Sequence, residues 1–272
     1  MSRRAGIGTL ALLTLAVSGC AADPDAADEA PRRTHGRNGS GGFTVQYRTG
    51  GKDARATTYL RSRQVLEKAV DRLNDTVTVP RRIPLVVRSC GAAEPAYDPE
   101  TGSIDFCVEH VGEVREHFED TGKDVDGDER AARVTGVLTE TAYHEGAHAL
   151  IDTLGLHFTG REEDVADQFA AVMLVRQGRS GEDGALAAAA DYALSAKENP
   201  ADDTDLRDEH SLDGQRAANY ACYVYGAHPA RHRDLVRDGT LTEDRADGCP
   251  DEWKQAKKGW EMLLGSHLKK RL

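Results

Sequence analysis

The chain contains a histidine pair whose spacing suits a metal ion. His144 and His148 are four residues apart, so on a helix both imidazoles lie on one face, about one turn from each other. Glu145 follows the first histidine, where a carboxylate can take a proton from water held by the metal. This HExxH pattern predicts a zinc hydrolase site with one Zn²⁺ per chain.

A second pair of carboxylates follows at helical spacing. Glu163 and Asp167 are also four residues apart, so a second helix can offer one carboxylate to the metal and the other to a ligand histidine. The two histidines and Glu163 then supply three protein ligands and leave a fourth position for water, as in catalytic zinc sites. Glu162 and Asp164 flank Glu163 and remain alternative third ligands, and all three also fit an acidic first helical turn.

HExxH followed by ExxxD resembles the gluzincins, the thermolysin-like side of the zincins. Asp152 extends the likeness to HExxHAxxD, so the resemblance implies that Asp152 and Asp167 support the metal ligands. In thermolysin-like enzymes a downstream histidine and a tyrosine stabilise the oxyanion, which implies catalytic roles for His210 and, second, for Tyr225. The residues also allow the tyrosines to pack in the core, with Arg216 paired to a carboxylate of the site.

A longer stretch is similar to a bacterial family of unknown function described as "putative metallopeptidase". The likeness rests on HExxHA and on a GREEDxADQ block at residues 160–168. It extends upstream to residues 90–107 and downstream to residues 208–226, and it spans most of residues 83–262. The resemblance implies a zincin-like fold and peptide hydrolysis.

The segments around the motifs predict an α+β domain, in which a small N-terminal sheet precedes a mainly helical part that carries the metal site. Residues 43–48, 83–88 and 103–107 have strand patterns, and residues 56–73 have the spacing of one helix. From Glu129 onward the pattern is mainly helical, including an alanine-rich segment at 185–196. We expect the 103–107 strand at the sheet edge beside the metal helix, where zincins pair with an extended substrate.

The N-terminus predicts export. Arg3 and Arg4 precede an apolar run over residues 7–17 that is too short to span a bilayer, and residues 17–20 resemble a lipoprotein cleavage site. We expect a lipoprotein signal peptide over residues 1–20 that ends at the lipidated Cys20, with an ordinary secretory signal as the alternative. A flexible linker over 21–42 and one metallopeptidase domain over 43–272 follow.

The four remaining cysteines suit an oxidising compartment. We expect the pairs Cys90–Cys107 and Cys222–Cys249, because each closes a local loop that contains turn residues. The chain has no CxxC spacing, which argues against a cysteine-based zinc site.

Charge and motifs together favour one function class. A net charge of −11 argues against a nucleic-acid partner. We expect an extracytoplasmic zinc peptidase that acts on a peptide or protein substrate and is held at the membrane by a lipid anchor. A zinc amidase acting on the cell envelope and a catalytically weak surface binding module are the alternatives, although the binding module would have no need of Glu145.

Overall fold

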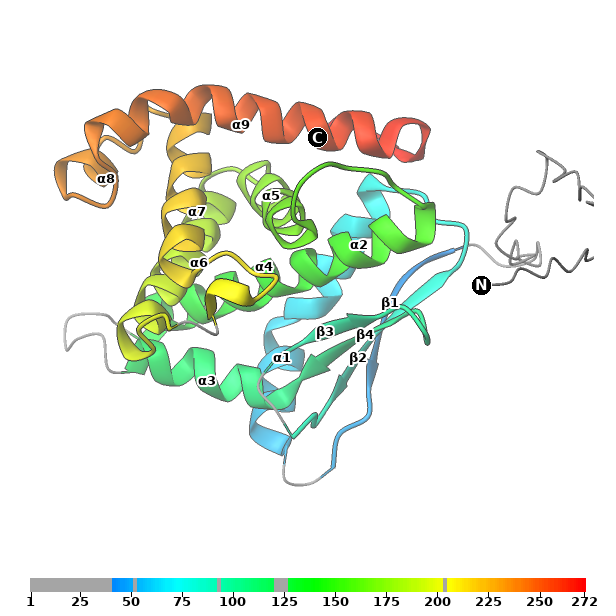
Figure 1. Cartoon of the computed structure of the whole chain (residues 1–272). Coiled ribbons are helices and arrows are strands. Elements are labelled where there is room, and N and C mark those ends of the chain that lie inside the picture. Colours follow the sequence, from blue (N-terminus) through cyan, green and yellow to red (C-terminus); the bar gives the residue numbers. More distant parts are fainter. Residues whose placement is uncertain (1–40, 51–52, 92–93, 120–126, 203–204) are drawn as a thin grey trace, which may run out of the picture. The chain divides into compact units, whose positions relative to one another are not determined.

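The computed structural model describes residues 41–50, 53–91, 94–119, 127–202 and 205–272 (Figure 1). The expected signal peptide, the lipidation site at Cys20 and residues 21–40 of the expected linker lie outside these described residues. Among the described helices, none has both the length and the apolar character that a bilayer span requires.

A small mixed sheet forms the N-terminal side of the α+β fold. Its strands are β1 (Gly42–Tyr47), β2 (Arg82–Arg88), β3 (Ala96–Asp98) and β4 (Ser103–Cys107). They lie in the order β1-β2-β4-β3, with β1, β2 and β4 parallel and β3 antiparallel to β4. The run Leu85, Val86 and Val87 of β2 is buried, as expected for an interior strand with both faces covered.

The strand predictions are confirmed for β1, β2 and β4, but the expected edge position of residues 103–107 is wrong. On one side β4 pairs with β2 from Leu85 to Arg88, and on the other side it pairs with β3. The edge strand on the β4 side of the sheet is therefore β3. Sequence analysis missed β3 because its three residues, Ala96–Asp98, are too few to show an alternating pattern.

Helices make up the rest of the described chain, and the predicted helical character after Glu129 is confirmed. They are α1 (Ala54–Arg63), α2 (Val65–Thr76), α3 (Val108–Glu119), α4 (Gly127–Leu154), α5 (Glu162–Val175), α6 (Arg179–Glu198), α7 (Asp213–Ala227), α8 (Asp234–Arg237) and α9 (Glu243–Leu264), with short 3-10 turns at Asp205–Arg207 and Gly265–His267. The single helix expected over 56–73 is instead two helices, because Gln64 adopts φ 54° in the left-handed region and breaks the chain of helical hydrogen bonds.

Helix α4 lies between the sheet and the C-terminal helices. It contacts β3 and β4 on one side and α5 and α6 on the other (Figure 1). Its crossing with α6 is close because Gly136 faces Gly184: a Cβ atom on Gly136 would lie 2.7 Å from the Gly184 Cα. The polar residues Glu140, Thr141, His144 and Glu145 of α4 are buried in this position, so each requires a polar partner.

The hydrophobic core extends over the whole described chain from residue 41 onward. Its members range from Phe43 in β1 to Leu272 at the C-terminus, and Trp260 of α9 donates from its indole to the Val165 carbonyl at 3.0 Å. The disulfides Cys90–Cys107 and Cys222–Cys249 are both present, which confirms the predicted pairing. Residues 41–272 thus contain their own core and both cross-links, and we treat this segment as able to fold alone.

One buried carboxylate of α6 lies outside the metal region. Glu182 has no exposed surface, and it accepts hydrogen bonds from Arg231 at 2.5 and 2.7 Å and from His232 at 2.8 Å. Burial alone would raise its pKa, but the bonds from Arg231 and His232 outweigh burial and hold the pKa of Glu182 below its ordinary value. The folded state therefore favours the ionised carboxylate.

We expect Glu182→Gln to lower the free energy of unfolding by about 2 kcal/mol at pH 7, because charge-assisted hydrogen bonds contribute that much. Since the folded pKa is depressed, this stabilisation is present above the unfolded pKa of about 4.3 and is lost as the pH falls through the folded value. Urea unfolding at neutral and acidic pH measures both effects. An equal loss of unfolding free energy at neutral and acidic pH would show that the charge of the Glu182 carboxylate contributes nothing to stability.

Candidate metal centre

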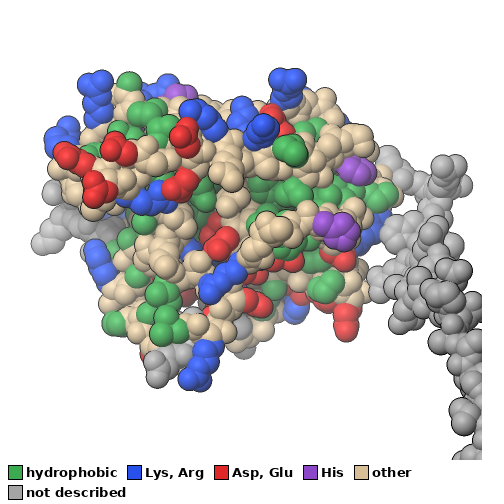
Figure 2. Space-filling model, turned by 45° about the horizontal axis from the view of Figure 1, so that its top comes forward, with side chains coloured by type: hydrophobic (Ala, Val, Ile, Leu, Met, Phe, Trp, Pro, Cys, Tyr) green, Lys and Arg blue, Asp and Glu red, His purple; other side chains and the backbone are tan. Residues whose placement is uncertain are grey.

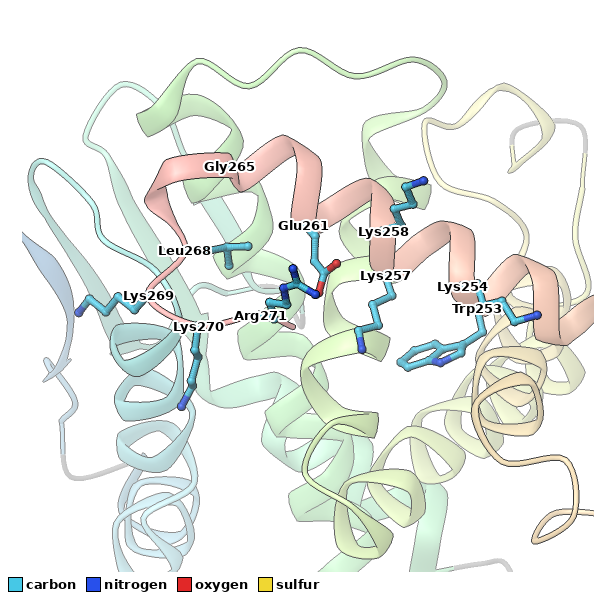
Figure 3. Close-up of a pocket in the computed structure, with 10 residues that line it drawn as sticks. All are labelled: Trp253, Lys254, Lys257, Lys258, Glu261, Gly265, Leu268, Lys269, Lys270 and Arg271. Carbon is cyan, nitrogen blue, oxygen red and sulfur yellow. The ribbon is translucent and has the colours of Figure 1, made fainter.

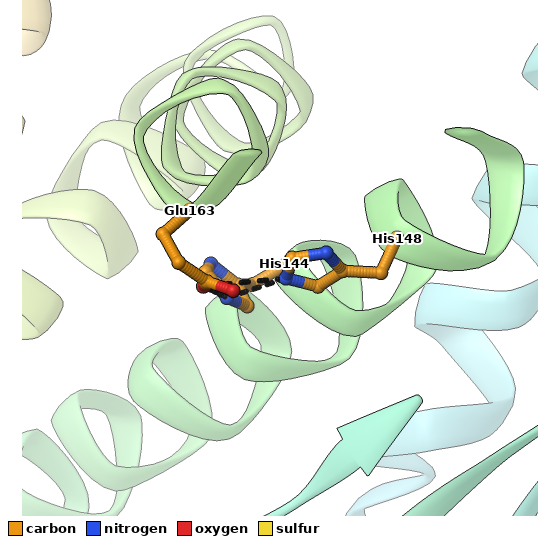
Figure 4. A group of neighbouring side chains, drawn as sticks. All are labelled: His144, His148 and Glu163. Carbon is orange, nitrogen blue, oxygen red and sulfur yellow. Dashed lines mark hydrogen bonds and ion pairs between the residues drawn. The ribbon is translucent and has the colours of Figure 1, made fainter. Parts of the chain in front are cut away.

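Two histidines of α4 and one carboxylate of α5 point toward one another (Figure 4). The Nε2 atoms of His144 and His148 are 3.1 Å apart, since HExxH spacing places both rings on one face of α4. Glu163, in the first turn of α5, places its Oε2 3.0 Å from the His144 Nε2 and 3.3 Å from the His148 Nε2. The structure thus brings together the three residues expected as ligands.

These distances fit a tetrahedral zinc site. Bonds of about 2.0–2.1 Å to zinc separate neighbouring ligand atoms by about 3.3 Å, close to the spacing of the three ligand atoms. The Nδ1 atoms of His144 and His148 face the carboxylates of Asp167 and Glu162, each at 2.9 Å. When the Nδ1 atoms carry the ring protons, the two Nε2 lone pairs and the Glu163 oxygen face one point. A metal cation satisfies all three.

Asp167 supports His144 and is itself held by Arg216 of α7. Arg216 donates from Nε to Oδ2 at 2.9 Å and from Nη2 to Oδ1 at 2.7 Å. Burial would raise the pKa of Asp167, but the charge of Arg216 and the hydrogen bond with His144 hold it far below the usual range. The carboxylate stays ionised beside His144. The carboxylate partner considered for Arg216 is therefore Asp167.

Burial and charge act in opposite directions on the two α4 residues beside the ion position. Burial would lower the pKa of His144, but the carboxylates of Asp167 and Glu163 outweigh it and raise the pKa to about 10. Burial raises the pKa of Glu145, whose Oε2 accepts a 2.7 Å hydrogen bond from the backbone N–H of Tyr97 in β3. The negative field therefore favours a cation at the histidines, and Glu145 has the raised pKa that suits a general base.

Asp152 does not contact a ligand histidine, which corrects the expected supporting role. Its Oδ2 accepts hydrogen bonds from the Tyr97 hydroxyl at 2.6 Å and from Arg81 at 3.0 Å, and Arg81 also donates to the Tyr97 hydroxyl at 2.8 Å. Asp152 is four residues beyond His148, so it lies one turn further along α4, toward the sheet. These contacts fasten the edge strand β3 to α4.

His210 lies beside the three ligands. Its Nε2 is 3.0 Å from the Glu163 Oε2, and its Nδ1 is 2.8 Å from the Asp208 Oδ1. The hydrogen bond with Glu163 and, after it, that with Asp208 outweigh burial and raise the pKa of His210 to about 9. The loop that carries His210 is tied to α5, since Arg161 donates to the His210 carbonyl at 3.0 Å.

Tyr225 has different surroundings. It packs against the cluster that contains the Cys222–Cys249 disulfide, and within the described residues no hydrogen bond or ion pair joins it to the metal centre. It follows Tyr220 by five positions, and therefore projects from another side of α7 than Tyr220, whose hydroxyl bonds to Glu140. The structure does not bring Tyr225 to the ligands.

Two carboxylates of the centre have positions that sequence analysis missed. Glu140 is buried one turn before His144 on α4, where Tyr220 donates to it. Glu162, expected either as an alternative third ligand or as part of an acidic first helical turn, faces the Nδ1 of His148. The spacing of four residues between Glu140 and His144 was the available signal for the first, whereas no local pattern placed Glu162 beside the Nδ1 of His148.

An open cleft of about 440 Å³ adjoins the metal centre. It is lined by Arg161, Glu162, Glu163 and Glu209. Glu163 belongs to both the cleft lining and the group with His144 and His148, so the cleft lies next to the candidate metal centre.

We expect Asp167→Asn to weaken zinc binding about 10–100-fold, because residues that orient a ligand histidine contribute this much to metal affinity. Competition for zinc with a calibrated chelator measures the change. Asp152→Asn is the matched control, since Asp152 contacts Arg81 and Tyr97 rather than a ligand histidine, and it should keep the wild-type affinity. Equal losses of zinc affinity in both variants would show that Asp167 contributes no more to zinc binding than Asp152 does.

Comparison with known proteins gives one family. A family model described as "Putative metallopeptidase" matches residues 47–264, a range that includes the ligand histidines, Glu163 and His210. No curated protein and no solved structure matches the chain.

Proposed function

The chain belongs to the family described as "Putative metallopeptidase", and we propose that it is a zincin-like, zinc-dependent peptidase that hydrolyses peptide bonds outside the cytoplasm. The observation that carries the proposal is the convergence of His144, His148 and Glu163, with Glu145 adjacent on the same helix. Two imidazoles and one carboxylate are a ligand set that catalytic zinc sites use. When bound there, zinc supplies a Lewis acid that lowers the pKa of water and polarises a carbonyl group.

Glu145 is the proposed general base. The Tyr97 N–H holds its Oε2 at 2.7 Å, which leaves Oε1 to accept a proton from the attacking water. The same carboxyl then gives the proton to the leaving amine, so that both products form without a net change in Glu145. The raised pKa of Glu145 supports this transfer in both directions.

His210 is the proposed stabiliser of the oxyanion. Asp208 accepts from its Nδ1 at 2.8 Å, which fixes the ring and directs Nε2 toward the ligand group. A protonated Nε2 donates a hydrogen bond to the negative oxygen as the carbonyl becomes tetrahedral. We leave Tyr225 out of this scheme because of its position beside the disulfide.

The edge strand β3 is the proposed surface for the substrate backbone, in place of residues 103–107. It pairs with β4 on one side only, and its Tyr97 contacts both Glu145 and Asp152 of α4. An extended peptide that adds to this edge would lie along the metal helix.

Export, lipid attachment at Cys20 and a catalytic domain over residues 43–272 complete the proposal. The two disulfides support export, because such cross-links persist in oxidising compartments and are rare in the cytosol.

A peptide-library digest read by mass spectrometry tests the proposed function. We expect the purified protein to cleave a subset of peptides, to stop when zinc is removed with a chelator, and to resume when zinc is returned. Cleavage that continues after complete removal of the metal would contradict the proposal.

A further inference from the structure

The C-terminal part of the molecule carries a groove whose charge is opposite to that of the chain as a whole. This basic groove, of about 650 Å³, lies between α9 and the tail that follows it (Figure 3). Six of its ten lining residues are basic: Lys254, Lys257, Lys258, Lys269, Lys270 and Arg271. Glu261 is the one acidic residue among those ten, and the basic groove shares no lining residue with the cleft beside the metal centre.

Most of this positive charge is uncompensated. Lys254 forms an ion pair with Asp251 at 3.0 Å, and Lys269 donates to the Asn74 carbonyl at 2.6 Å. The other four basic side chains form no ion pair within the described part of the chain. Like charges held together repel one another, and they do so here in a protein of net charge −11. An anionic partner would relieve this repulsion.

The arrangement of the basic side chains favours an extended partner over a small one. In Figure 3, Lys257 and Arg271 face the space between α9 and the tail, whereas Lys254 and Lys258 extend away from the helix. The lysine ammonium group is a point charge, and it lacks the planar guanidinium with which arginine forms two hydrogen bonds to one phosphate. Figure 2 shows Lys and Arg side chains spread along the face that carries α9, with Asp and Glu side chains among them toward the α8 end. The basic side chains therefore form a strip along α9 and the tail, and not a pocket for one small anion.

A large aromatic side chain accompanies the charges. Trp253 lines the groove and is partly exposed, whereas the exposed Met262, nine positions further along α9, projects from the opposite side of the helix and does not line the groove. A tryptophan ring beside basic side chains is typical of surfaces that rest on lipid headgroups. An inorganic polyanion such as polyphosphate has no apolar group that would contact the ring.

We propose that the basic groove docks the catalytic domain on an anionic membrane surface, through the phosphodiester headgroups of its lipids. The lipid anchor expected at Cys20 would keep the domain close to that surface, and the groove would supply a second attachment that fixes which face of the domain meets the membrane. This inference does not depend on the proposed peptidase activity.

Vesicle sedimentation tests the proposal on residues 41–272, which carry no lipid. We expect this segment to sediment with vesicles of equimolar phosphatidylglycerol and phosphatidylcholine at about 0.1 M salt, and to stay in solution with phosphatidylcholine alone. Raising the salt to about 1 M should release it, because the screening length falls to about 3 Å. Binding to both vesicle types, or to neither, would overturn the proposal.

Two quadruple variants with the same change in net charge separate the groove from general electrostatics. The groove variant carries Lys257→Gln, Lys258→Gln, Lys270→Gln and Arg271→Gln. The control variant carries Arg82→Gln, Arg179→Gln, Lys197→Gln and Arg233→Gln, all at exposed positions outside the groove. Thermal unfolding should give the wild-type midpoint for both.

We expect the groove variant to bind the anionic vesicles on the order of 600-fold more weakly, because each of the four removed cations would strengthen binding about fivefold. The loss of vesicle affinity in the control variant should be less than about a tenth of that in the groove variant, since the control substitutions lie outside the groove. Equal losses would attribute binding to net charge and overturn the proposal. Tight binding of polyphosphate without binding to the vesicles would overturn it in favour of a soluble polyanion.

Discussion

Glu145→Gln is expected to stop peptide cleavage while the protein keeps its zinc. Glutamine has the shape of glutamate and can still accept the hydrogen bond from the Tyr97 N–H, so the site should retain its structure. It cannot take the proton from water, and general base catalysis contributes about 10²–10⁴-fold to the rate. We therefore expect kcat to fall by about that factor. Cleavage of one library-derived peptide, with zinc content measured on the same sample, checks both the loss of turnover and the retention of zinc.

The two readouts separate the proposed roles. Wild-type turnover in Glu145→Gln would contradict the assignment of the base, whatever the metal content. Loss of zinc together with turnover would show that Glu145 holds the metal or its surroundings, and the scheme in which only the histidines and Glu163 bind the ion would then be wrong.

Glu163→Gln is expected to weaken zinc binding about 100-fold or more. Zinc sites bind with about 10–16 kcal/mol, so that one ligand among four contributes about 3 kcal/mol. The Glu163 Oε2 is the atom that faces both histidine Nε2 atoms, at 3.0 and 3.3 Å. An amide oxygen keeps the size of the side chain but loses its negative charge. Competition with a calibrated chelator measures the affinity.

The neighbouring acidic residues provide matched controls for this ligand. Glu162 faces the His148 Nδ1 but its side chain is 43% exposed, so Glu162→Gln should weaken zinc binding about tenfold, the low end of the range for residues that orient a ligand histidine. Asp164 accepts from the Ser211 hydroxyl at 2.6 Å, so Asp164→Asn should leave zinc affinity unchanged. A larger loss in Glu162→Gln than in Glu163→Gln would identify Glu162 as the third ligand.

The parts of the site that sequence analysis predicted were recognised from the local spacing of residues. Residues four apart on a helix share a face, and this rule alone paired His144 with His148 and Glu163 with Asp167. Local patterns also located the strands β1, β2 and β4, by alternation in β1 and by an apolar run bounded by turn residues in β2. The resemblance to other HExxH proteins then indicated that the helix with the histidines and the helix with Glu163 form one site.

Contacts between distant segments account for what sequence analysis missed. Asp152 fits the thermolysin-like pattern, yet its partner is Arg81, which lies 71 positions earlier. The side of α7 from which Tyr225 projects depends on how that helix packs against α9, and no local pattern specifies it. The break at Gln64 is similar, since a residue with ordinary helical propensity adopts φ 54° there. Tertiary contacts decided the surroundings of Asp152 and Tyr225.

The zinc content of the purified protein, measured by elemental mass spectrometry after dialysis, tests the metal centre most directly. We predict about one zinc per chain for the wild type and almost none for a His144→Ala, His148→Ala double variant that keeps both disulfides. Zinc near zero in folded, disulfide-bonded wild-type protein would contradict the assignment of His144, His148 and Glu163 as a zinc site.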